Sequence, residues 1–288
     1  LVKKQWFVAV KELKSQIDFS STDVVIGPFF QKNVDAFSEV FKNQDLMVVS
    51  PLSTDTGKPY PNQVHAMPNN GMIRNTMMEY LRSNYGNLVA VVNPKSNSNK
   101  AFFTQNYSEV KLVNTSDNGS LSASAIESQL VQGKVNYVIL DSNSMKTAID
   151  LITSIKKLKS KYDIRLVALE KLDVLDSTEV QIHDLVDFKF TFPSVTNDAT
   201  SNVNVKFEEA FKKRFNTSPN RFAIRGFDVT MDVISRMMQD DDNGENIFGY
   251  GSEQIENKFT YVNENGGIFN SGIYVLYYDK DLTIKEAQ

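Results

Sequence analysis

DVVIGPFFQKNVDAFSEVFKNQDLMVVSPLST, residues 23–54, is the stretch that decides the fold of this chain. Residues 23–26 form a short β-branched run typical of a buried strand, and Gly27 with Pro28 ends it. A helix is expected next, because apolar residues recur on one side at helical spacing. Those residues are Val34, Phe37, Val40 and Phe41. Residues 46–49 form a second apolar strand, so the stretch is a strand-helix-strand unit.

The two strands of this unit must run parallel, because a helix-length crossover returns the chain to the same end of the sheet. The turns at 27–31 and 50–54 therefore follow the carboxyl ends of neighbouring strands. Open parallel sheets bind ligands at that edge.

The rest of the chain continues the alternation of helices and strands. Helices are expected over 1–18, 72–84, 98–107, 122–131 and 144–160, and strands over 88–92, 110–113, 136–140 and 164–169. Regular alternation of this kind means a parallel sheet covered by helices on both faces.

The C-terminal part is expected to hold a strand over 187–192, a helix carrying Phe207, Phe211 and Phe215, and a further helix. The apolar residues of that further helix are Ala223, Phe227, Met231, Ile234 and Met238. Strands over 258–262 and 272–278 flank NENGGIFN, whose paired glycines suit a tight hairpin. The sequence predicts an α/β protein with two doubly wound parallel-sheet lobes and several crossovers between them.

Composition excludes several classes of function. The net charge is −4 with a pI near 5.4, which argues against a phosphate-binding surface of the kind that nucleic-acid-binding proteins carry. The chain has no cysteine, so disulfides, thiolate catalysis and cysteine metal sites are excluded. No apolar run reaches the roughly 20 residues that a membrane-spanning helix needs.

Catalytic motifs are missing from the sequence. The two histidines, His65 and His183, lie far apart in regions expected to be irregular, and the interpretation favoured for both is a loop histidine. No GxSxG, Walker or HExxH motif occurs. Glu208 and Glu209 lie on the exterior of a helix, where nothing positions them for acid-base work. The sequence predicts a protein that is not an enzyme and uses no metal or cofactor.

Small polar residues follow the expected strands of both lobes. They are Gln31, Ser50, Ser53 and Thr54 in the first lobe, and Asn93, Ser96, Asp141, Ser142, Asn143 and Glu170 in the second. Hydroxyl, amide and carboxylate groups at strand ends suit a ligand held by hydrogen bonds in a cleft between lobes. The alternative is that Ser, Asn and Asp occur here because turns use them anyway.

Several segments carry a resemblance to a known family. IGPFF with its following helix and VVSPLST, then NLVAVVNP, FTFPSVTND and NGGIFNSGIYVLYY, occur in the order and spacing of the type I periplasmic binding proteins, the branched-chain amino acid receptor family. The chain resembles this family over nearly its whole length. Family members normally open with a strand-helix-strand segment that has no counterpart here, so the chain is expected to be a fragment or domain of something longer.

The resemblance implies interleaved lobes, with 1–66 plus 194–257 in one and 67–193 plus 258–288 in the other. It also implies site roles: the segment at Ser53 and Thr54 holds a ligand carboxylate, and Glu170 binds a ligand ammonium group. Two positions depart from the family. Gln31 replaces a small hydroxyl residue, and the aromatic residue usual near Asn143 is missing.

Two functions from different classes follow. The first is non-enzymatic binding of a small polar, amino-acid-like ligand in the cleft, as a solute-binding or sensor module of the cell envelope. Its partners would be that ligand and a transporter permease or envelope protein, with no nucleic acid, and the chain would be a monomer or homodimer in the periplasm or envelope. The alternative is a ligand-free interaction or scaffold domain of an envelope or peptidoglycan-associated protein.

Overall fold

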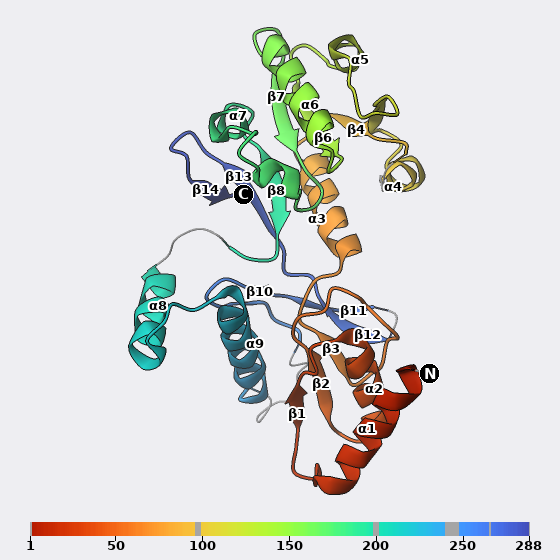
Figure 1. Ribbon diagram of the computed structural model, residues 1–288, viewed down its shortest axis with the longest axis vertical. Coiled ribbons are helices and arrows are strands. Elements are labelled where there is room, and N and C mark those ends of the chain that lie inside the picture. The colour runs from red at the N-terminus through yellow and green to blue at the C-terminus, as the bar shows by residue number, and fades with distance from the viewer. Residues whose placement is uncertain (1, 96–98, 198–201, 240–247, 265, 288) are drawn as a thin grey trace. The chain divides into compact units, whose positions relative to one another are not determined.

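The computed structural model describes residues 2–95, 99–197, 202–239, 248–264 and 266–287, and the chain divides into two compact units (Figure 1). Unit 1 contains Leu1–Met72 and Val195–Ile273, and unit 2 contains Ile73–Ser194 and Tyr274–Gln288. The first boundary, expected at 66/67, lies between Met72 and Ile73, and residues 258–273 were expected in the second lobe. In the structure, residues 258–273 belong to unit 1 because one of their strands pairs with a strand near residue 64.

The sheet of unit 1 has the strand order β1-β2-β3-β12-β11. Its strands are β1 (Val24–Ile26), β2 (Met47–Ser50), β3 (Gln63–His65), β12 (Gly267–Asn270) and β11 (Tyr261–Glu264). The first four run parallel, and β11 is antiparallel to β12. The strand-helix-strand prediction for residues 23–54 is confirmed by the parallel pairing of β1 with β2. A separate pair joins β9 (Ser252–Glu253) to β10 (Lys258–Phe259).

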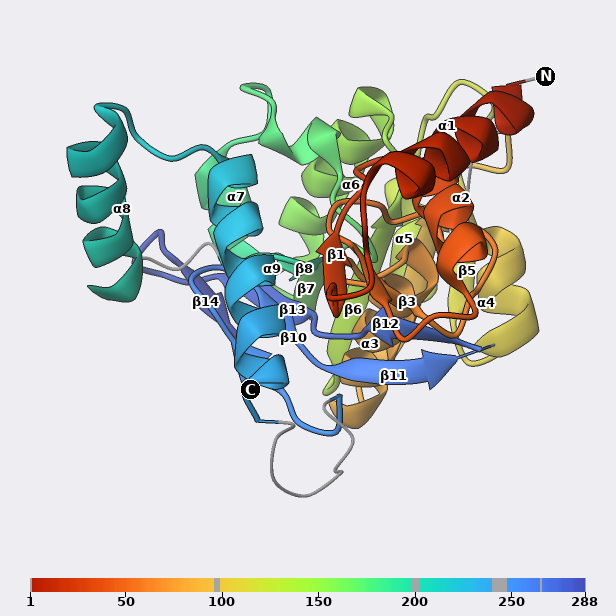
Figure 2. The ribbon, with the colours of Figure 1, turned by 90° about the horizontal axis from the view of Figure 1, so that it is seen from below.

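Helices cover both faces of this sheet. On one face, α2 (Gln31–Phe41) packs Val34, Phe37 and Phe41 against Val48 of β2, and α1 (Val2–Gln16) lies along α2 (Figures 1 and 2). On the other face, α9 (Arg221–Met237) packs against β2 and β3. Alternate residues of each strand therefore meet different helices, as the two-residue period of a strand requires.

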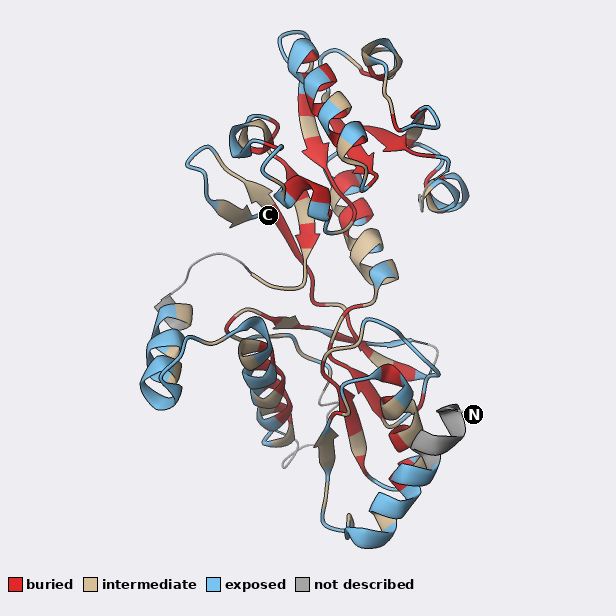
Figure 3. Ribbon diagram, in the orientation of Figure 1, coloured by how far each residue is buried: buried red, intermediate tan, exposed pale blue. Residues whose placement is uncertain are grey.

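The helix α9 buries charged as well as apolar side chains, since Val229 and Val233 on its buried side pack in the core of unit 1. It buries four charged side chains, Arg225, Asp228, Asp232 and Arg236. The residues exposed on its other side are apolar: Phe227, Met231, Ile234 and Met238. Figure 3 shows this helix red along one side and blue along the other.

The helix α8 (Asn202–Phe215) lies beside α9 (Figures 1 and 2). The ring of Phe207 meets that of Phe227 at 4.8 Å between centroids. Of the α8 side chains that the structure describes, at 204–215, none is buried. This pair of helices therefore gives unit 1 an apolar exposed surface.

Unit 2 is built on a larger sheet with the order β14-β13-β8-β7-β6-β4-β5. Its strands are β4 (Asn87–Val92), β5 (Lys111–Asn114), β6 (Val135–Asp141), β7 (Asp163–Val167), β8 (Thr191–Ser194), β13 (Tyr274–Tyr278) and β14 (Ile284–Glu286). Strands β4 to β8 run parallel, and β13 is antiparallel to both of its neighbours.

Helices lie on both faces of the unit 2 sheet. They are α3 (Asn70–Ser83), α4 (Lys100–Asn106), α5 (Ala123–Glu127), α6 (Met145–Leu158), the 3₁₀ helix η1 (Asp173–Asp176) and α7 (Ile182–Asp187). One core cluster joins β4, β6 and β7 to α5 and α6, and a second joins the same strands to α3 and α4. Within the residues that the structure describes, no helix combines the length and apolar character needed to cross a membrane.

Two sequence predictions about strands are wrong in detail. Residues 187–192 do not form one strand: α7 ends at Asp187, Lys189 adopts φ 44°, and β8 begins only at Thr191. The turn buries both Phe188 and Phe190, which explains why the aromatic residues suggested a strand. The tight hairpin at NENGGIFN joins β11 to β12, because Ile268, Phe269 and Asn270 are themselves strand residues.

The close approach of Gly272 to Lys258 provides a test of the unit 1 packing. A Cβ at Gly272 would lie 2.2 Å from the Lys258 carbonyl oxygen, whereas a Cβ at Gly226 of α9 would meet nothing within 4 Å. Gly272→Ala should lower the free energy of unfolding by about 1–3 kcal/mol. Gly226→Ala should raise it by about 0.5–1 kcal/mol, because alanine favours the helix. Urea unfolding of both variants checks this, and equal effects of the two would contradict the packing described.

Candidate functional site

Polar groups of unit 1 gather where β2 and β3 end. Ser50 closes β2, His65 closes β3, and the two residues are paired in the parallel register. Gln31 begins α2, the helix that follows β1. The side chains of Gln31, Ser50 and His65 are all buried. The structure thus brings Gln31 and Ser50, both predicted as site residues, to one edge of the same sheet.

The carboxylate of Asp35 organises two amide side chains at this edge. Gln31 Nε2 donates to Asp35 Oδ1 at 2.7 Å, and Gln63 Nε2 donates to the same oxygen at 3.3 Å. Both amides are therefore oriented with their NH₂ groups toward Asp35. Their Oε1 atoms, together with Ser50 Oγ and His65 Nε2, are buried and make no hydrogen bond within the described residues.

Unpaired buried polar atoms are unusual, because each costs about 1–3 kcal/mol when it loses water without gaining a partner. Four of them in one neighbourhood mark this edge of unit 1 as a candidate ligand-binding surface. We call it the unit 1 polar site, defined by Gln31, Ser50, Gln63 and His65. Three of its free atoms are oxygens, and glutamine oxygens accept hydrogen bonds.

His65 differs from its sequence-based interpretation. It lies in β3 with 1% of its surface exposed, and its ring stacks on that of Phe269 at 4.4 Å. The prediction of a loop histidine is therefore wrong. It could not include the stacking ring of Phe269, which belongs to a strand two hundred residues further along the chain. Burial lowers the pKa of His65 to about 4, although the nearby carboxylates of Asp35 and Asp55 act in the opposite direction.

The loop after β2 packs closely against this site at Gly57. Gly57 adopts φ +54°, and a Cβ there would lie 2.6 Å from Asp35 Oδ1 and 2.7 Å from Gln31 Nε2. Within the loop, Ser53 Oγ accepts from the Asp55 amide at 3.2 Å, while Thr54 is exposed. Ser53 and Thr54, predicted as site residues, thus lie in the segment that follows Ser50, but their hydroxyls are not buried with it.

Unit 2 carries a second polar group at the carboxyl ends of three neighbouring strands. Asn93 follows β4, Ser142 and Asn143 follow β6, and Glu170 comes three residues after the end of β7. Because β7, β6 and β4 are adjacent and parallel, these residues lie at one edge, as predicted. Asn93 and Ser142 are buried and Asn143 is exposed, while Ser96 falls outside the described residues.

Asp141 is the buried carboxylate of this edge. Its oxygens accept from the Asn99 backbone amide at 2.6 Å and from Asn99 Nδ2 at 2.7 Å. Burial raises the pKa of Asp141, although the bonds from Asn99 favour the ionised form. Asn99 Oδ1 in turn accepts from Arg74 Nη1 at 2.9 Å, so the network extends to the first turns of α3.

Glu170 lies at the open side of this network. Its side chain is 41% exposed, and its Oε2 atom lies 3.9 Å from Arg74 Nη1. The carboxylate therefore meets both solvent and a cation, in keeping with the high cost of burying an unpaired charge. We call Arg74, Asn99, Asp141 and Glu170 the unit 2 polar site.

The two polar sites contain acids, amides and hydroxyls, which are the groups of a binding surface. Among the residues that the structure describes, no three His, Asp or Glu side chains are grouped so as to hold a metal ion. What this arrangement can do chemically is to accept and donate hydrogen bonds to a bound molecule.

Solved structures with similar folds share most of this architecture. One, a protein from Rhodospirillum rubrum described as a branched-chain amino acid ABC transporter, superposes with a TM-score of 0.63 at 12% identity, covering 99% of this chain and 84% of the other. Another, a branched-chain amino acid ABC transporter periplasmic ligand-binding protein from Burkholderia xenovorans, gives 0.57 at 7% identity, covering 98% and 81%. This chain has the type I periplasmic binding protein fold.

A third structure of the type I fold is an ABC transporter substrate-binding protein from Desulfitobacterium hafniense in complex with Leu. It superposes with a TM-score of 0.52 at 12% identity, covering 99% of this chain and 85% of the other. No protein-family model matches the chain, and no curated protein sequence matches it. The likeness therefore establishes the type I fold, and the function has to be argued from the chain's own residues.

Sequence reasoning missed four residues of the two sites, Gln63, His65, Arg74 and Asn99. It also missed Asp35, which orients the amides of Gln31 and Gln63. The alternation in Gln63-Val64-His65 was a signal for a strand, but three residues are too few to separate a strand from a loop. Arg74 and Asn99 are 25 residues apart, and only the packing of α4 on α3 brings them into contact. No sequence pattern indicated that contact.

The lowered pKa of His65 predicts a specific loss of stability in acid. The unfolded chain binds a proton at the ordinary histidine pKa of 6.5, while the folded chain resists protonation down to about 4. Stability from this residue is complete above pH 6.5 and falls as the pH drops toward 4, by up to about 3 kcal/mol.

His65→Gln should therefore make the unfolding free energy less dependent on pH between 6.5 and 4. His183→Gln is the matched control, because His183 is exposed. Denaturant unfolding at a series of pH values measures both variants. The burial argument fails if the two variants keep the same pH slope as the parent chain.

Proposed function

We propose that this chain binds a small polar ligand, amino-acid-like or related, without catalysing its conversion. The observation that carries the proposal is the unit 1 polar site, where four buried polar atoms on β2, β3 and the helix after β1 make no hydrogen bond among the described residues. A ligand that donates hydrogen bonds would satisfy these atoms and recover the free energy that their burial costs.

The unit 2 polar site supports the same proposal through a different set of residues. Glu170 is partly exposed and ionisable, so it suits the ammonium group of an amino-acid-like ligand. Arg74, held by Asn99, keeps a cation at the same edge, which suits a carboxylate. Unit 2 thus contributes one charge of each sign, which matches the two charges of a zwitterionic ligand.

Gln31 bears on which ligands are preferred. In the resembling receptors a small hydroxyl residue stands at this position, whereas here an amide side chain is fixed by Asp35 with its oxygen unpaired. That oxygen accepts hydrogen bonds and repels a carboxylate. We therefore place ligands rich in N–H donors, such as basic amino acids, amides or short peptides, ahead of the branched-chain amino acids.

The proposed setting is the cell envelope, where a binding protein of this fold would deliver its ligand to a transporter permease or signal to an envelope receptor. The named activities of the solved relatives, binding within ABC transporter systems, support this setting. Ligand binding would shift the populations of two conformations that the partner distinguishes.

A thermal-shift panel of amino acids, amides, short peptides and sugars tests the proposal. At a concentration of about 100 times Kd, a specific ligand should stabilise the native chain by about 2.7 kcal/mol, because it binds only the folded state. Glu170→Gln should weaken the affinity about tenfold, corresponding to about 1.4 kcal/mol. Isothermal titration calorimetry measures the affinities.

Glu179→Gln is the control for this experiment, since Glu179 is exposed on unit 2 outside the polar site. It should leave the affinity unchanged. If no compound in the panel stabilises the chain, or if Glu170→Gln and Glu179→Gln have the same effect, the proposed ligand site is wrong.

One observation favours a second candidate function, a protein-interaction module. The apolar stripe of α9 and the neighbouring rings of α8 are exposed, and apolar surfaces of this kind occur where proteins meet. A chain that responds to no ligand in the panel would fit this alternative.

A further inference from the structure

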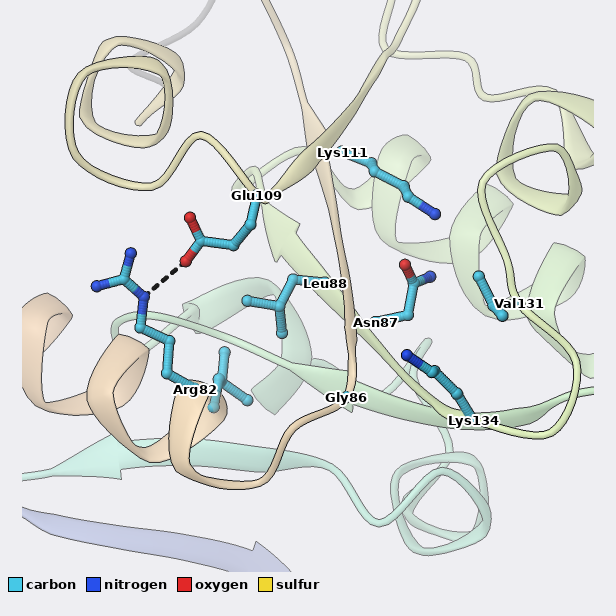
Figure 4. A pocket seen from close by; sticks show the side chains of 9 residues that line it. Arg82, Gly86, Asn87, Leu88, Glu109, Lys111, Val131 and Lys134 are labelled. Atoms are coloured by element: carbon cyan, nitrogen blue, oxygen red, sulfur yellow. Dashed lines mark hydrogen bonds and ion pairs between the residues drawn. The ribbon is translucent and has the colours of Figure 1, made fainter.

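A pocket of about 360 Å³ lies in unit 2 at the amino-terminal edge of the sheet, the edge opposite the unit 2 polar site (Figure 4). Its lining comes from the starts of β4 and β5, the turn before β6 and the end of α3. The lining residues are Leu81, Arg82, Gly86, Asn87, Leu88, Glu109, Lys111, Val131 and Lys134. None of them takes part in either polar site.

The register of the strands explains why the pocket is basic on one side. Asn87 pairs with Asn136, and Val89, two residues further along β4, pairs with Lys111. Side chains two residues apart share a face of a strand, so Asn87, Lys111 and Lys134 belong to the same face of the sheet. Figure 4 shows the two lysine side chains on the side of β4 where Asn87 lies, with Arg82 and Glu109 on the other side.

The charges of the pocket do not cancel. Arg82 Nε lies 2.6 Å from Glu109 Oε1, so these two charges neutralise each other. Lys111 and Lys134 form no ion pair among the described residues, and Lys111 Nζ donates only one hydrogen bond there, to the Gln129 carbonyl oxygen at 3.1 Å. Two ammonium groups with free N–H donors therefore face one pocket.

In another surface pocket of unit 2, the positive charges have acidic partners. The one lined by Lys159, Lys161 and Asp187 pairs its lysines with acids, since Lys159 contacts Asp187 at 2.6 Å and Lys161 contacts Glu127 at 2.7 Å. Lys111 and Lys134 have no such acidic partner among the described residues, unlike Lys159 and Lys161.

A buried asparagine fixes the wall of the pocket. Asn136 Oδ1 accepts from the Val131 amide at 2.8 Å, and Asn136 Nδ2 donates to the carbonyl oxygens of Val131 and Lys134 at 3.0 Å each. Asn87 Nδ2 also donates to Asn136 Oδ1, at 2.9 Å. The turn that carries Lys134 is therefore held to the strand beside it. Because it is already ordered, ligand binding would cost little further conformational entropy.

We propose that this pocket binds a small oxyanion, with Lys111 and Lys134 as the residues that contact it. Carboxylates and phosphates share the chemistry required, two or more oxygens that accept hydrogen bonds from ammonium groups. The site is separate from the ligand site proposed above and does not depend on it.

Isothermal titration calorimetry with sodium phosphate and with sodium malonate, at constant ionic strength maintained with sodium chloride, tests the inference. Lys111→Met and Lys134→Met should each weaken anion affinity about tenfold, because each removes a charge-assisted hydrogen bond. Lys157→Met is the matched control: it makes the same change of charge on the exposed side of α6 and should leave the affinity unchanged.

The two anions distinguish the source of the oxyanion. Heat from phosphate alone would assign a phosphate group, and heat from malonate alone would assign a carboxylate. Amide NMR shifts of Val131 and Lys134 during the titration of the parent chain locate the site without any substitution. Absence of binding by both anions, or equal weakening by Lys157→Met, would overturn the inference.

Discussion

The buried guanidinium of Arg225 is the interaction on which unit 1 depends. Its Nε donates to the Pro51 carbonyl oxygen at 3.1 Å and its Nη2 donates to the carbonyl oxygen of Ala66. These carbonyls follow β2 and β3, so one side chain from α9 ties together the ends of both strands that carry the unit 1 polar site. Burial lowers the pKa of Arg225 to about 10, which leaves it protonated at neutral pH.

The other buried charges of α9 also have hydrogen-bonding partners inside unit 1. Asp228 accepts hydrogen bonds from the backbone amides of Ile255, Glu256 and Asn257, each at 3.0 Å. Asp232 and Arg236 form a fully buried ion pair one helical turn further on, at 2.9 Å. Buried charges are tolerated only when paired and hydrogen-bonded. Arg225 and Asp228 find their partners in distant segments of the chain, whereas Asp232 and Arg236 pair with each other.

These contacts explain what could be predicted from the sequence and what could not. The strand-helix-strand unit at 23–54 and the alternation of unit 2 follow from local periodicity, which packing then reinforces. The orientation of α9 did not follow. Phe227, Met231 and Ile234 are the residues that the sequence pattern predicts to be buried. The opposite side is buried instead, because Val229 and Val233 pack in the core and the charged side chains beside them hydrogen-bond to carbonyls and amides of distant loops.

The residues of the candidate sites likewise divide into those that could be predicted from the sequence and those that could not. Gln31, Ser50, Asn93, Ser142 and Glu170 could be predicted because strand ends of a parallel sheet meet at one edge. Gln63 and His65 could not, since their burial depends on pairing with β12 and on the ring of Phe269. Local sequence therefore located the edges, while contacts over long separations decided which side chains are enclosed there.

The interleaving of the two units has a consequence for biosynthesis. A ribosome releases the five parallel strands of unit 2, β4 to β8, as one continuous run, so they can associate as soon as they emerge. The first three strands of unit 1 are made earlier but gain their neighbour β12 only after some two hundred further residues. During translation β1, β2 and β3 are thus without their neighbour β12 for some two hundred residues, and their apolar side chains are ones that chaperones would have to shield.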